Sequence, residues 1–522
     1  MTKKQTVCAA ILLAAVLAGA ARGRAAENGS KSATPSVVRY ADFGARGDGK
    51  TDDLEAIVKA HAFANTHGLP VKANSNATYL IGGKNKTAVI QTNTDFGSAR
   101  FIIDDTSVKN RNANVFEIRS ALQPIRPKGL SSLKRDQRKT GLTLPHSCVV
   151  VVSNSHVKRY IRRGSNRNNG SAQNDVLVVD PKGDVDAKTP IIWDFDRITS
   201  IIAYPVDKTP LRVSGGRFTT IANAAEPKYA YYSRGIVIRR SNVLVDGLEH
   251  RITGEGDKGA PYGGFINISR CANVTIRNTV LTGHKTYWTI GSAGRRVSMG
   301  SYDITLNRAM NVSFVNCRQT NSIHDRTYWG IIGTNYCKNL SFDRCAFSRF
   351  DAHQGVVNAT IRNSTLGYMG ISTIGSGTFL VENTTVSGRR FVNLRQDYGS
   401  TWRGEFIIRN CVFKPAPGSA CLIGGFNDGQ HNFGYTCYMP AKITIEKLRI
   451  DDARHPRNYT GPTIFGNFNR RYTNKSYVEK YPYVKTQKVI LKDVTTASGK
   501  PLRVSDNRFM FRDVVVTRPV GK

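Results

Sequence analysis

Acidic side chains are scarce in this chain of 522 residues: 38 Asp and Glu stand against 75 Lys and Arg, a formal net charge of +37 at pH 7. The nine cysteines show no metal-ligand spacing. Helix-type apolar periodicity is scarce after residue 70, and no apolar run beyond the first residues is long enough to cross a bilayer. These shortages argue against a cysteine-held metal centre, a mainly helical domain and a membrane-spanning helix in the body of the chain.

The first residues predict a secretory signal peptide. Two lysines precede an apolar stretch from about Val7 to Leu17, and small residues up to Ala20 offer a cleavage site. The stretch is too short for a membrane anchor. We therefore expect a secreted or periplasmic protein, with residues 1–26 as signal peptide, cleavage near Ala20, and residues 27–522 as a single domain.

The excess of basic side chains predicts a polyanionic partner. For an exported protein we expect an anionic polysaccharide and no nucleic acid, because counterion release operates on any line of negative charges. A charge of this size suits a sulfated, glycosaminoglycan-like chain better than a weakly charged plant pectin. The alternatives are an adaptation of the whole surface, or binding to an anionic cell envelope.

One phrase recurs from about residue 242 onward: a short run with alternating apolar side chains that closes on a polar residue. The clearest copies are Asn242–Gly247, Asn273–Asn278, Asn311–Asn316, Asn339–Arg344 and Asn358–Asn363. Further copies close at Asn383, Asn410, Lys447 and Asp493. One strand per irregular repeat, with the variation in length placed in loops, is typical of a parallel β-solenoid. The phrase therefore predicts an all-β fold.

The segment from Ala41 to Asp53, Ala-Asp-Phe-Gly-Ala-Arg-Gly-Asp-Gly-Lys-Thr-Asp-Asp, resembles the opening of the pectate lyase superfamily, which related glycosidases and phage tailspikes share. Its last three residues offer an N-cap to a helix that starts near Leu54. The resemblance implies a single-stranded right-handed parallel β-helix whose first coil this helix caps. It is specific for fold and nearly silent on chemistry, and we interpret its aspartates as turn and cap residues.

Two segments depart from the repeat. A densely basic insertion at about 104–175 contains weak strands such as Cys148–Val152, and we interpret it as early coils with long loops, one of which could wall a cleft. A solvated basic face is the alternative. The segment at about 453–485, rich in Tyr, Asn and Arg, is predicted to be a long loop before the final strand. Among the cysteines, Cys421 and Cys437 could pair or stay free.

Aligning the repeats by their closing residues brings His, Tyr, Arg and Lys together over three or four coils, since neighbouring parallel strands lie about 4.8 Å apart. These residue types suit β-elimination of a uronic-acid polymer. A cation or amide must neutralise the carboxylate, a base must take the C5 proton, and an acid must serve the leaving oxygen. The alignment places this chemistry between about residues 284 and 368.

We hypothesise that His353 is the base and Tyr328 the acid or alternative base, and that Arg349 holds the carboxylate with help from Asn335 or His324. The residues expected to bind substrate are Lys285, Tyr287, Trp288, Arg326, Trp329, Tyr368 and Arg395. A structural role is the alternative for each: His324 could pair with Asp325 in a loop, and His353 could satisfy Asp351 at a corner.

Two other functions compete with a metal-independent lyase. Polygalacturonase-type hydrolases use paired carboxylates and carry an Asn-Thr-Asp, an Asp-Asp and a Gly-His-Gly in the central coils of the same fold. In this chain Asn93-Thr94-Asp95 and Asp104-Asp105 occur too early, and no Gly-His-Gly exists. The acid-poor central repeats also disfavour a calcium-dependent mechanism, so we expect no metal and no cofactor. The third possibility is a non-catalytic adhesin or tailspike-like module that grips a polyanion with arginines and stacks sugars on aromatic rings.

Overall fold

The computed structural model places most of the chain. The described residues are 36–110, 112–223, 232–257, 259, 262–418 and 420–518. Val37–Lys522 forms one compact unit. The predicted signal peptide, residues 1–26, lies outside the described residues. Within the described part, no helix is long and apolar enough to cross a membrane.

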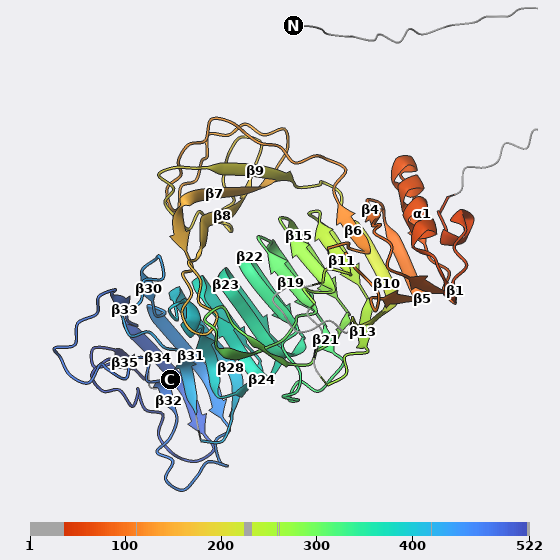
Figure 1. Ribbon diagram of the computed structural model, residues 1–522. Helices are drawn as coiled ribbons and strands as arrows, with labels where there is room; N and C mark the ends of the chain where they lie inside the picture. Colours follow the sequence, from red (N-terminus) through yellow and green to blue (C-terminus); the bar gives the residue numbers. More distant parts are fainter. Residues whose placement is uncertain are drawn as a thin grey trace, which may run out of the picture. The chain divides into compact units, whose positions relative to one another are not determined.

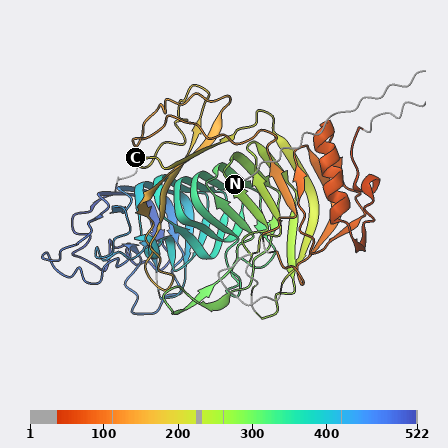
Figure 2. The ribbon, with the colours of Figure 1, turned by 45° about the horizontal axis from the view of Figure 1, so that its top comes forward.

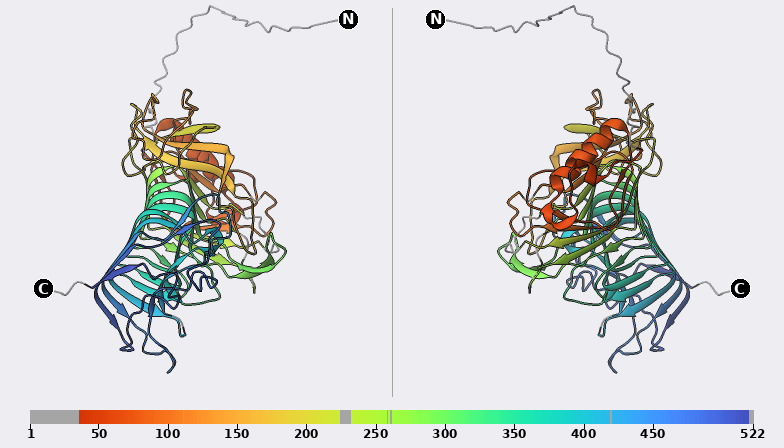
Figure 3. Two further views of the ribbon diagram at one scale, coloured as in Figure 1. Left: turned by 90° about the vertical axis from the view of Figure 1, so that its left-hand side faces the viewer. Right: turned by 90° about the vertical axis from the view of Figure 1, so that its right-hand side faces the viewer.

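In the part of the chain that the structure describes, 28 strands join one sheet, and their pairings are parallel (Figure 1, Figure 3). We divide it into three ladders. The first holds β2 (Val71–Lys72), β5 (Thr94–Asp104), β10 (Leu211–Ile221), β12 (Val243–Asp246), β15 (Ala272–Arg277), β20 (Met310–Val315), β22 (Ile332–Asp343), β23 (Ala346–Arg362), β25 (Gly375–Glu382), β28 (Trp402–Pro415), β31 (Lys442–Ile450), β34 (Lys488–Thr496) and β35 (Val515–Thr517).

The other two ladders share the longer strands. The second holds β1 (Asp48–Asp52), β3 (Thr78–Ile81), β13 (Glu249–Thr253), β16 (Val280–Leu281), β21 (Arg318–Gln319), β24 (Thr365–Thr373) and β26 (Thr385–Gly388), with parts of β5, β10, β23, β28, β31 and β34. The third holds β4 (Ala88–Ile90), β6 (Phe116–Arg119), β11 (Ile236–Arg239), β14 (Ile266–Ser269), β19 (Ile304–Asn307), β27 (Arg390–Leu394), β29 (Cys421–Gly424) and β32 (Thr463–Phe465), with parts of β22, β23 and β24. The all-β fold is confirmed, and the ladders are consistent with a parallel β-helix. The right hand stays a prediction.

Each copy of the recurring sequence motif forms a strand of the first ladder, and residues with a left-handed backbone conformation stand at its ends. The opening residues with positive φ are Asn242, Asn273, Asn311, Asn339 and Asn358. The closing ones are Gly247, Asn278, Asn316, Arg344, Asn363, Asn383, Asn410, Lys447 and Asp493. Asn tolerates this backbone better than other residues with a Cβ. The polar ends of the phrase are therefore the bends of the coil.

The asparagine amides of successive bends hydrogen-bond along the stack. Asn273 Nδ2 donates to Asn242 Oδ1 at 2.9 Å, and Asn311 Nδ2 donates to Asn273 Oδ1 at 2.9 Å. At the closing bends, Asn383 Nδ2 donates to Asn363 Oδ1 at 3.1 Å. The apolar side chains between the bends, such as Phe314, are buried inside the stack. The bends thus fix the register in which the core packs.

In the opening segment, Asp53 has the turn role that we interpreted for its aspartates. Asp53 accepts hydrogen bonds from the backbone N–H groups of Arg46 and Gly47 at 2.7 and 3.0 Å, so this aspartate shapes a turn. The segment forms the short helix η1 (Tyr40–Phe43), and the helix α1 (Leu54–His67) follows. α1 contributes Leu54 and Ile57 to the main core. Its role as a cap stays a prediction.

The interpretation of the basic insertion as early coils holds for β6, which joins the third ladder, and is wrong for Cys148–Val152. β7 (Cys148–Arg159), β8 (Ser171–Val179) and β9 (Ser200–Pro205) form a separate antiparallel sheet (Figure 2). The parallel ladders continue directly from β6 to β11 and from β5 to β10. Val150 faces the insertion's own core, whereas Val149 packs with Ala272 and Met310 of the coils. In this run Cys148–Val150 and Val152 are buried and Val151 is partly buried, so the run lacks the strict alternation of first-ladder strands such as β20.

Short elements complete the fold. β17 (Tyr287–Ile290) and β18 (Arg296–Met299) form an antiparallel hairpin, and η2 (Gln396–Tyr398) follows β27. The predicted loop at about 453–485 carries β32 and ends near β33 (Tyr483–Val484), which pairs with β30 (Cys437–Tyr438). Cys421 and Cys437 are both free and buried.

Two substitutions of the bend residue Asn363 should lower the free energy of unfolding by different amounts. Asn363 has φ 51°, and its amide both donates to and accepts from its ladder neighbours. Asn363→Gly removes the amide contacts and should lower the free energy of unfolding by about 1 kcal/mol. Asn363→Ala adds left-handed strain of about 1–2 kcal/mol. Urea unfolding measures both variants. Equal stability of the Ala and Gly variants would contradict the role of the bend.

Two buried histidines predict opposite pH dependences of stability. Burial lowers the pKa of His61 from 6.5 to about 3. The unfolded chain then binds more protons than the folded one between these values, so this contribution to stability is lost as pH falls from about 6.5 toward 3. Burial would also lower the pKa of His284, but its hydrogen bonds to Asp303 and Glu255 outweigh burial and raise the pKa to about 10. That contribution is full below about pH 6.5 and is lost as pH rises toward 10.

We therefore expect His61→Gln to flatten the fall in melting temperature between about pH 6 and about pH 4. The matched control is His67→Gln, on the exposed side of the same helix, which should melt like the wild type at each pH. Parallel pH profiles for all three proteins would count against a neutral buried His61.

Candidate functional site

A basic groove of about 570 Å3 lies at the junction of the second and third ladders. Its lining residues are His324, Arg326, Arg349, Tyr368, Met369, Ser372, Ser387, Gly388, Arg389, Arg390, Asn393, Lys414 and Ala416. They include four arginines and one lysine, and no Asp or Glu is among them. A groove of this composition attracts an anion and offers no carboxylate to a sugar bond.

Consecutive coils supply the groove. Ser372 of β24 and Asn393 of β27 are Cα partners, and Ser372 pairs in turn with Asp351 of β23. Asn393 Nδ2 donates to Ser372 Oγ at 3.4 Å. The basic side chains come from strand ends and turns beside this polar row. The stacking of coils therefore builds one continuous wall from residues far apart in sequence.

Arg349 is a buried cation with unused donors. Its side chain is 6% exposed, and Nη2 lies 2.6 Å from Asp351 Oδ2. The guanidinium lies over the Trp329 ring, 5.3 Å from its centroid. Nε and Nη1 have no hydrogen-bond partner among the described residues. Because unpaired buried donors are unfavourable and hydrogen bonds to charged groups are strong, Arg349 is well suited to receive an anionic group of a ligand.

A row of ion pairs holds Arg349 in place. Arg395 Nη1 lies 3.0 Å from Asp351 Oδ1, and Arg395 Nη2 lies 2.9 Å from Asp397 Oδ2. Asp397 also pairs with Arg162 of the insertion at 2.8 Å. Burial would raise the pKa of Asp351, but Arg349 and Arg395 outweigh it and lower the pKa. Burial would also raise the pKa of Asp397, but the charges of Arg395 and Arg162 outweigh it and lower the pKa to about 2. Both aspartates therefore stay ionised, and Asp397 binds the insertion to the coils.

The structure brings four of the predicted site residues into the groove. These are His324, Arg326, Arg349 and Tyr368. Two more support them: Trp329 backs Arg349, and the Tyr328 carbonyl oxygen accepts a hydrogen bond from the Tyr368 hydroxyl. The Tyr328 backbone also forms a β-bridge with Lys285. Trp329, Tyr328 and Lys285 are not among the lining residues of the groove itself.

The remaining predicted residues lie elsewhere. Trp288 is 59% exposed on the β17–β18 hairpin, where Arg296 lies 4.5 Å from its ring centroid. Tyr287 is buried in the same hairpin. Arg395 belongs to the ion-pair row described above. Asn335 Oδ1 lies 3.1 Å from His353 Nδ1, so these two predicted residues contact each other and not the groove.

His353 sits apart from Arg349 although both belong to β23. Its ring lies edge-on to Tyr398, with centroids 5.5 Å apart. Burial, followed by the charge of Arg395, lowers the pKa of His353 to about 3. The pairing of β22 with β23 shifts register at this point, because Thr334 pairs with Ala352 but Asn335 pairs with Gln354. The sequence alignment counted residues from the closing bend and could not register this bulge.

Sequence reasoning missed the C-terminal half of the groove. Arg389, Arg390 and Lys414 line it but were not predicted. A signal existed: Arg349 and Tyr368 each follow a closing residue by five positions. The same offset from Asn383 and Asn410 arrives within a residue of Arg389 and Lys414. The same offset therefore extends the site by two coils toward the C-terminus.

No family model matches this chain, and no curated protein matches it in sequence. Solved structures share its fold. The tailspike gp61 of Pseudomonas phage phi297 aligns with TM-score 0.58 and 14% identity, covering 92% of this chain and 84% of the tailspike. The tailspike gp49 of Pseudomonas phage LKA1 gives TM-score 0.51 and 14% identity over the same shares, 92% and 84%. The Gp54 tailspike of Acinetobacter baumannii bacteriophage AP22, solved with a capsular saccharide, gives 0.48 and 10%, covering 88% and 76%.

The likenesses to the phi297 and LKA1 tailspikes, at such low identity, bear on the fold alone and are consistent with a parallel β-helix. The narrower resemblance to the pectate lyase superfamily and the preference for glycosaminoglycans stay predictions.

The unused donors of Arg349 predict a specific loss of anion binding. Arg349→Ala should weaken binding of a sulfated polysaccharide tenfold or more, since a hydrogen bond to a charged group contributes about 1.5–3 kcal/mol. Arg362→Ala is the matched control, because Arg362 is exposed at the far end of the same strand. Calorimetric titration at fixed ionic strength measures both. Equal weakening by the two variants would mean that net charge alone governs binding.

Proposed function

We propose that this chain is an exported polysaccharide lyase that cleaves an acidic, uronate-containing polysaccharide by metal-independent β-elimination in the basic groove. The observation that carries the proposal is a groove rich in arginine, free of carboxylates among its described lining residues, and walled by a buried guanidinium with two unused donors. A sulfated glycosaminoglycan-like chain is the favoured substrate class, on a right-handed β-helix that α1 caps.

The composition of the groove separates elimination from hydrolysis. Most glycoside hydrolases use two carboxyl groups that flank the glycosidic bond. The lining residues of this groove include none. Elimination needs a cation to stabilise the enolate and a base to take the proton, and both kinds of group are present. The same lack of carboxylates leaves a calcium ion without its preferred ligands.

The roles follow from burial and hydrogen bonding. Arg349 would bind the uronate carboxylate and stabilise the charge that develops when the C5 proton leaves. His324, exposed at the rim, would take that proton. The electron pair forms the C4–C5 double bond, and the C4–O bond breaks. Tyr368, whose hydroxyl is kept protonated because burial raises its pKa, would turn that hydroxyl from the Tyr328 carbonyl to the substrate and protonate the leaving oxygen.

We expect the full chain to release unsaturated product from a panel of uronate polymers, seen as a rise in ultraviolet absorbance that chelators do not suppress. His324→Gln and Tyr368→Phe should each lower kcat by about 10²–10⁴-fold with little change in KM, the range of acid–base catalysis. His353→Gln, which alters a histidine outside the groove, is the control and should keep its activity.

Two results would overturn these assignments. Loss of activity in His353→Gln, with an unchanged melting temperature, would return the base to His353. Tight binding of the polymers without any product would indicate an adhesin-like binding module instead of an enzyme.

A further inference from the structure

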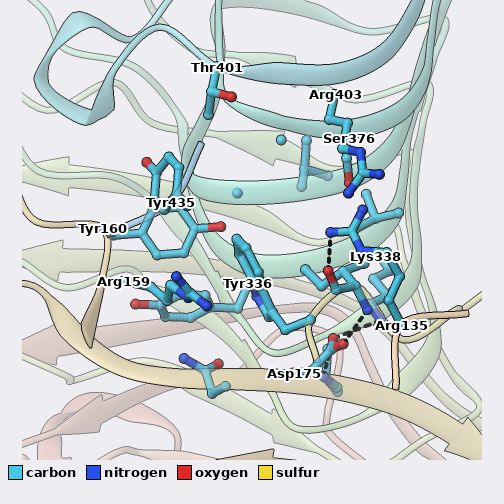
Figure 4. A pocket seen from close by; sticks show the side chains of 18 of the residues that line it. Arg135, Arg159, Tyr160, Asp175, Tyr336, Lys338, Ser376, Thr401, Arg403 and Tyr435 are labelled. Carbon is cyan, nitrogen blue, oxygen red and sulfur yellow. Dashed lines mark hydrogen bonds and ion pairs between the residues drawn. The ribbon is translucent and has the colours of Figure 1, made fainter. Parts of the chain in front are cut away.

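The antiparallel insertion encloses a second cavity against the coils. Its volume is about 280 Å3, and its lining includes Arg159 of β7, Trp193, Tyr336 of β22 and Arg403 of β28 (Figure 4). It shares no lining residue with the basic groove. We propose that this cavity is a separate binding site for a short acidic saccharide of one or two sugar rings. The proposal does not require the groove to be catalytic.

Aromatic rings from both sides form the cavity wall. They belong to Tyr160, Trp193, Tyr336, Tyr435 and Tyr438. Tyr160 meets Tyr336 at 72° and Tyr435 at 64°, with centroids 5.5 and 5.2 Å apart. Rings that meet edge to face offer no parallel slot for a flat heteroaromatic base. They do offer ring faces to the C–H face of a puckered sugar.

Two of these rings are held by unfavourable backbone conformations. Tyr160 has φ 55° and Tyr336 has φ 57°. A left-handed backbone costs about 1–2 kcal/mol for a residue with a Cβ, and such strain gathers at functional sites. Gly355 keeps the space beside Tyr160 open, because an added Cβ would lie 2.4 Å from the Tyr160 hydroxyl oxygen. The strained backbones of Tyr160 and Tyr336 and the missing side chain of Gly355 together keep the aromatic wall in this arrangement.

Charge in the cavity favours an acidic ligand. Lys338 and Asp175 pair at 2.8 Å and neutralise each other, both 1% exposed. Asp194 accepts a hydrogen bond from the Arg135 backbone at 2.8 Å. Arg403 lies 5.4 Å from the Tyr438 ring centroid. The other two arginines of the lining donate to backbone carbonyls, Arg135 to Ile192 and Arg159 to Gly434. A carboxylate or sulfate can therefore bind Arg403 while the sugar ring lies against the aromatic wall.

Size excludes the long polymer that suits the open groove. The cavity is slightly smaller than a typical small-molecule pocket, which begins at about 300 Å3. Ser376, the Cα partner of Arg403 in the neighbouring coil, adds a hydroxyl beside that cation. The aromatic rings, the Arg403 guanidinium and a hydroxyl make a site for a short acidic sugar.

The test uses the full chain carrying Arg349→Ala, which disables the groove, and a sulfated uronate disaccharide as probe. We expect saturable binding at one site by calorimetry. Adding Arg403→Ala should weaken it tenfold or more, and adding Ser376→Phe, which fills the cavity, should abolish it. Adding Arg409→Ala is the matched control: Arg409 is an exposed arginine of the same strand, paired with Glu446, and its loss should change nothing.

Each result decides the proposal. It is overturned if the disaccharide does not bind, if Arg403→Ala and Ser376→Phe leave the affinity unchanged, or if Arg409→Ala weakens binding as much as Arg403→Ala. It is also overturned if a nucleoside monophosphate binds in the same site more tightly than the disaccharide. Because the groove is already disabled, a failure here says nothing against the proposed lyase activity, and a lack of lyase activity would leave the cavity proposal standing.

Discussion

The structure depends on one repeated constraint: strands of the first ladder are bounded by residues with a left-handed backbone. This conformation is unfavourable for most side chains, and asparagine accepts it most readily after glycine. The same residue also carries an amide that both donates and accepts, so Asn339 donates to Asn311 at 2.7 Å and accepts from Asn358 at 3.0 Å. At the bends that carry asparagine, one side chain therefore supports the bend, the register and the hydrogen bonding between coils.

Because the register between neighbouring coils is fixed, side chains at matched positions of successive strands form a continuous surface. Outward side chains at matched positions of β23, β24 and β27 become neighbours, and Asp351, Ser372 and Asn393 form one row. The groove is built beside this row, where strand ends bring basic residues together. Its charge is therefore a property of the stack and not of any one loop, which explains how an anionic polymer could contact several coils at once.

Sequence analysis reached the residues that stand at a constant offset from a bend. Arg349 and Tyr368 were found because each follows a closing residue by five positions. His353 could not be placed in this way, because the bulge opposite Asn335 lies beyond the reach of counting. The insertion was misinterpreted for a different reason. Its valine run was taken for a coil strand although it lacks the alternating burial of first-ladder strands such as β20. The pairing of β6 with β11, far apart in sequence, shows that the third ladder continues without the strands of the antiparallel sheet.

The ion-pair row explains why an anion suits the groove. Arg349, Asp351, Arg395, Asp397 and Arg162 alternate in sign, so each carboxylate lies between two guanidinium groups. The row contains three cations and two anions. At the insertion end Arg162 makes two contacts with Asp397, through Nε at 2.9 Å and Nη2 at 2.8 Å. At the groove end Arg349 keeps two donors without partners among the described residues. The surplus positive charge is therefore least satisfied in the groove wall, and a bound carboxylate or sulfate would complete the alternation.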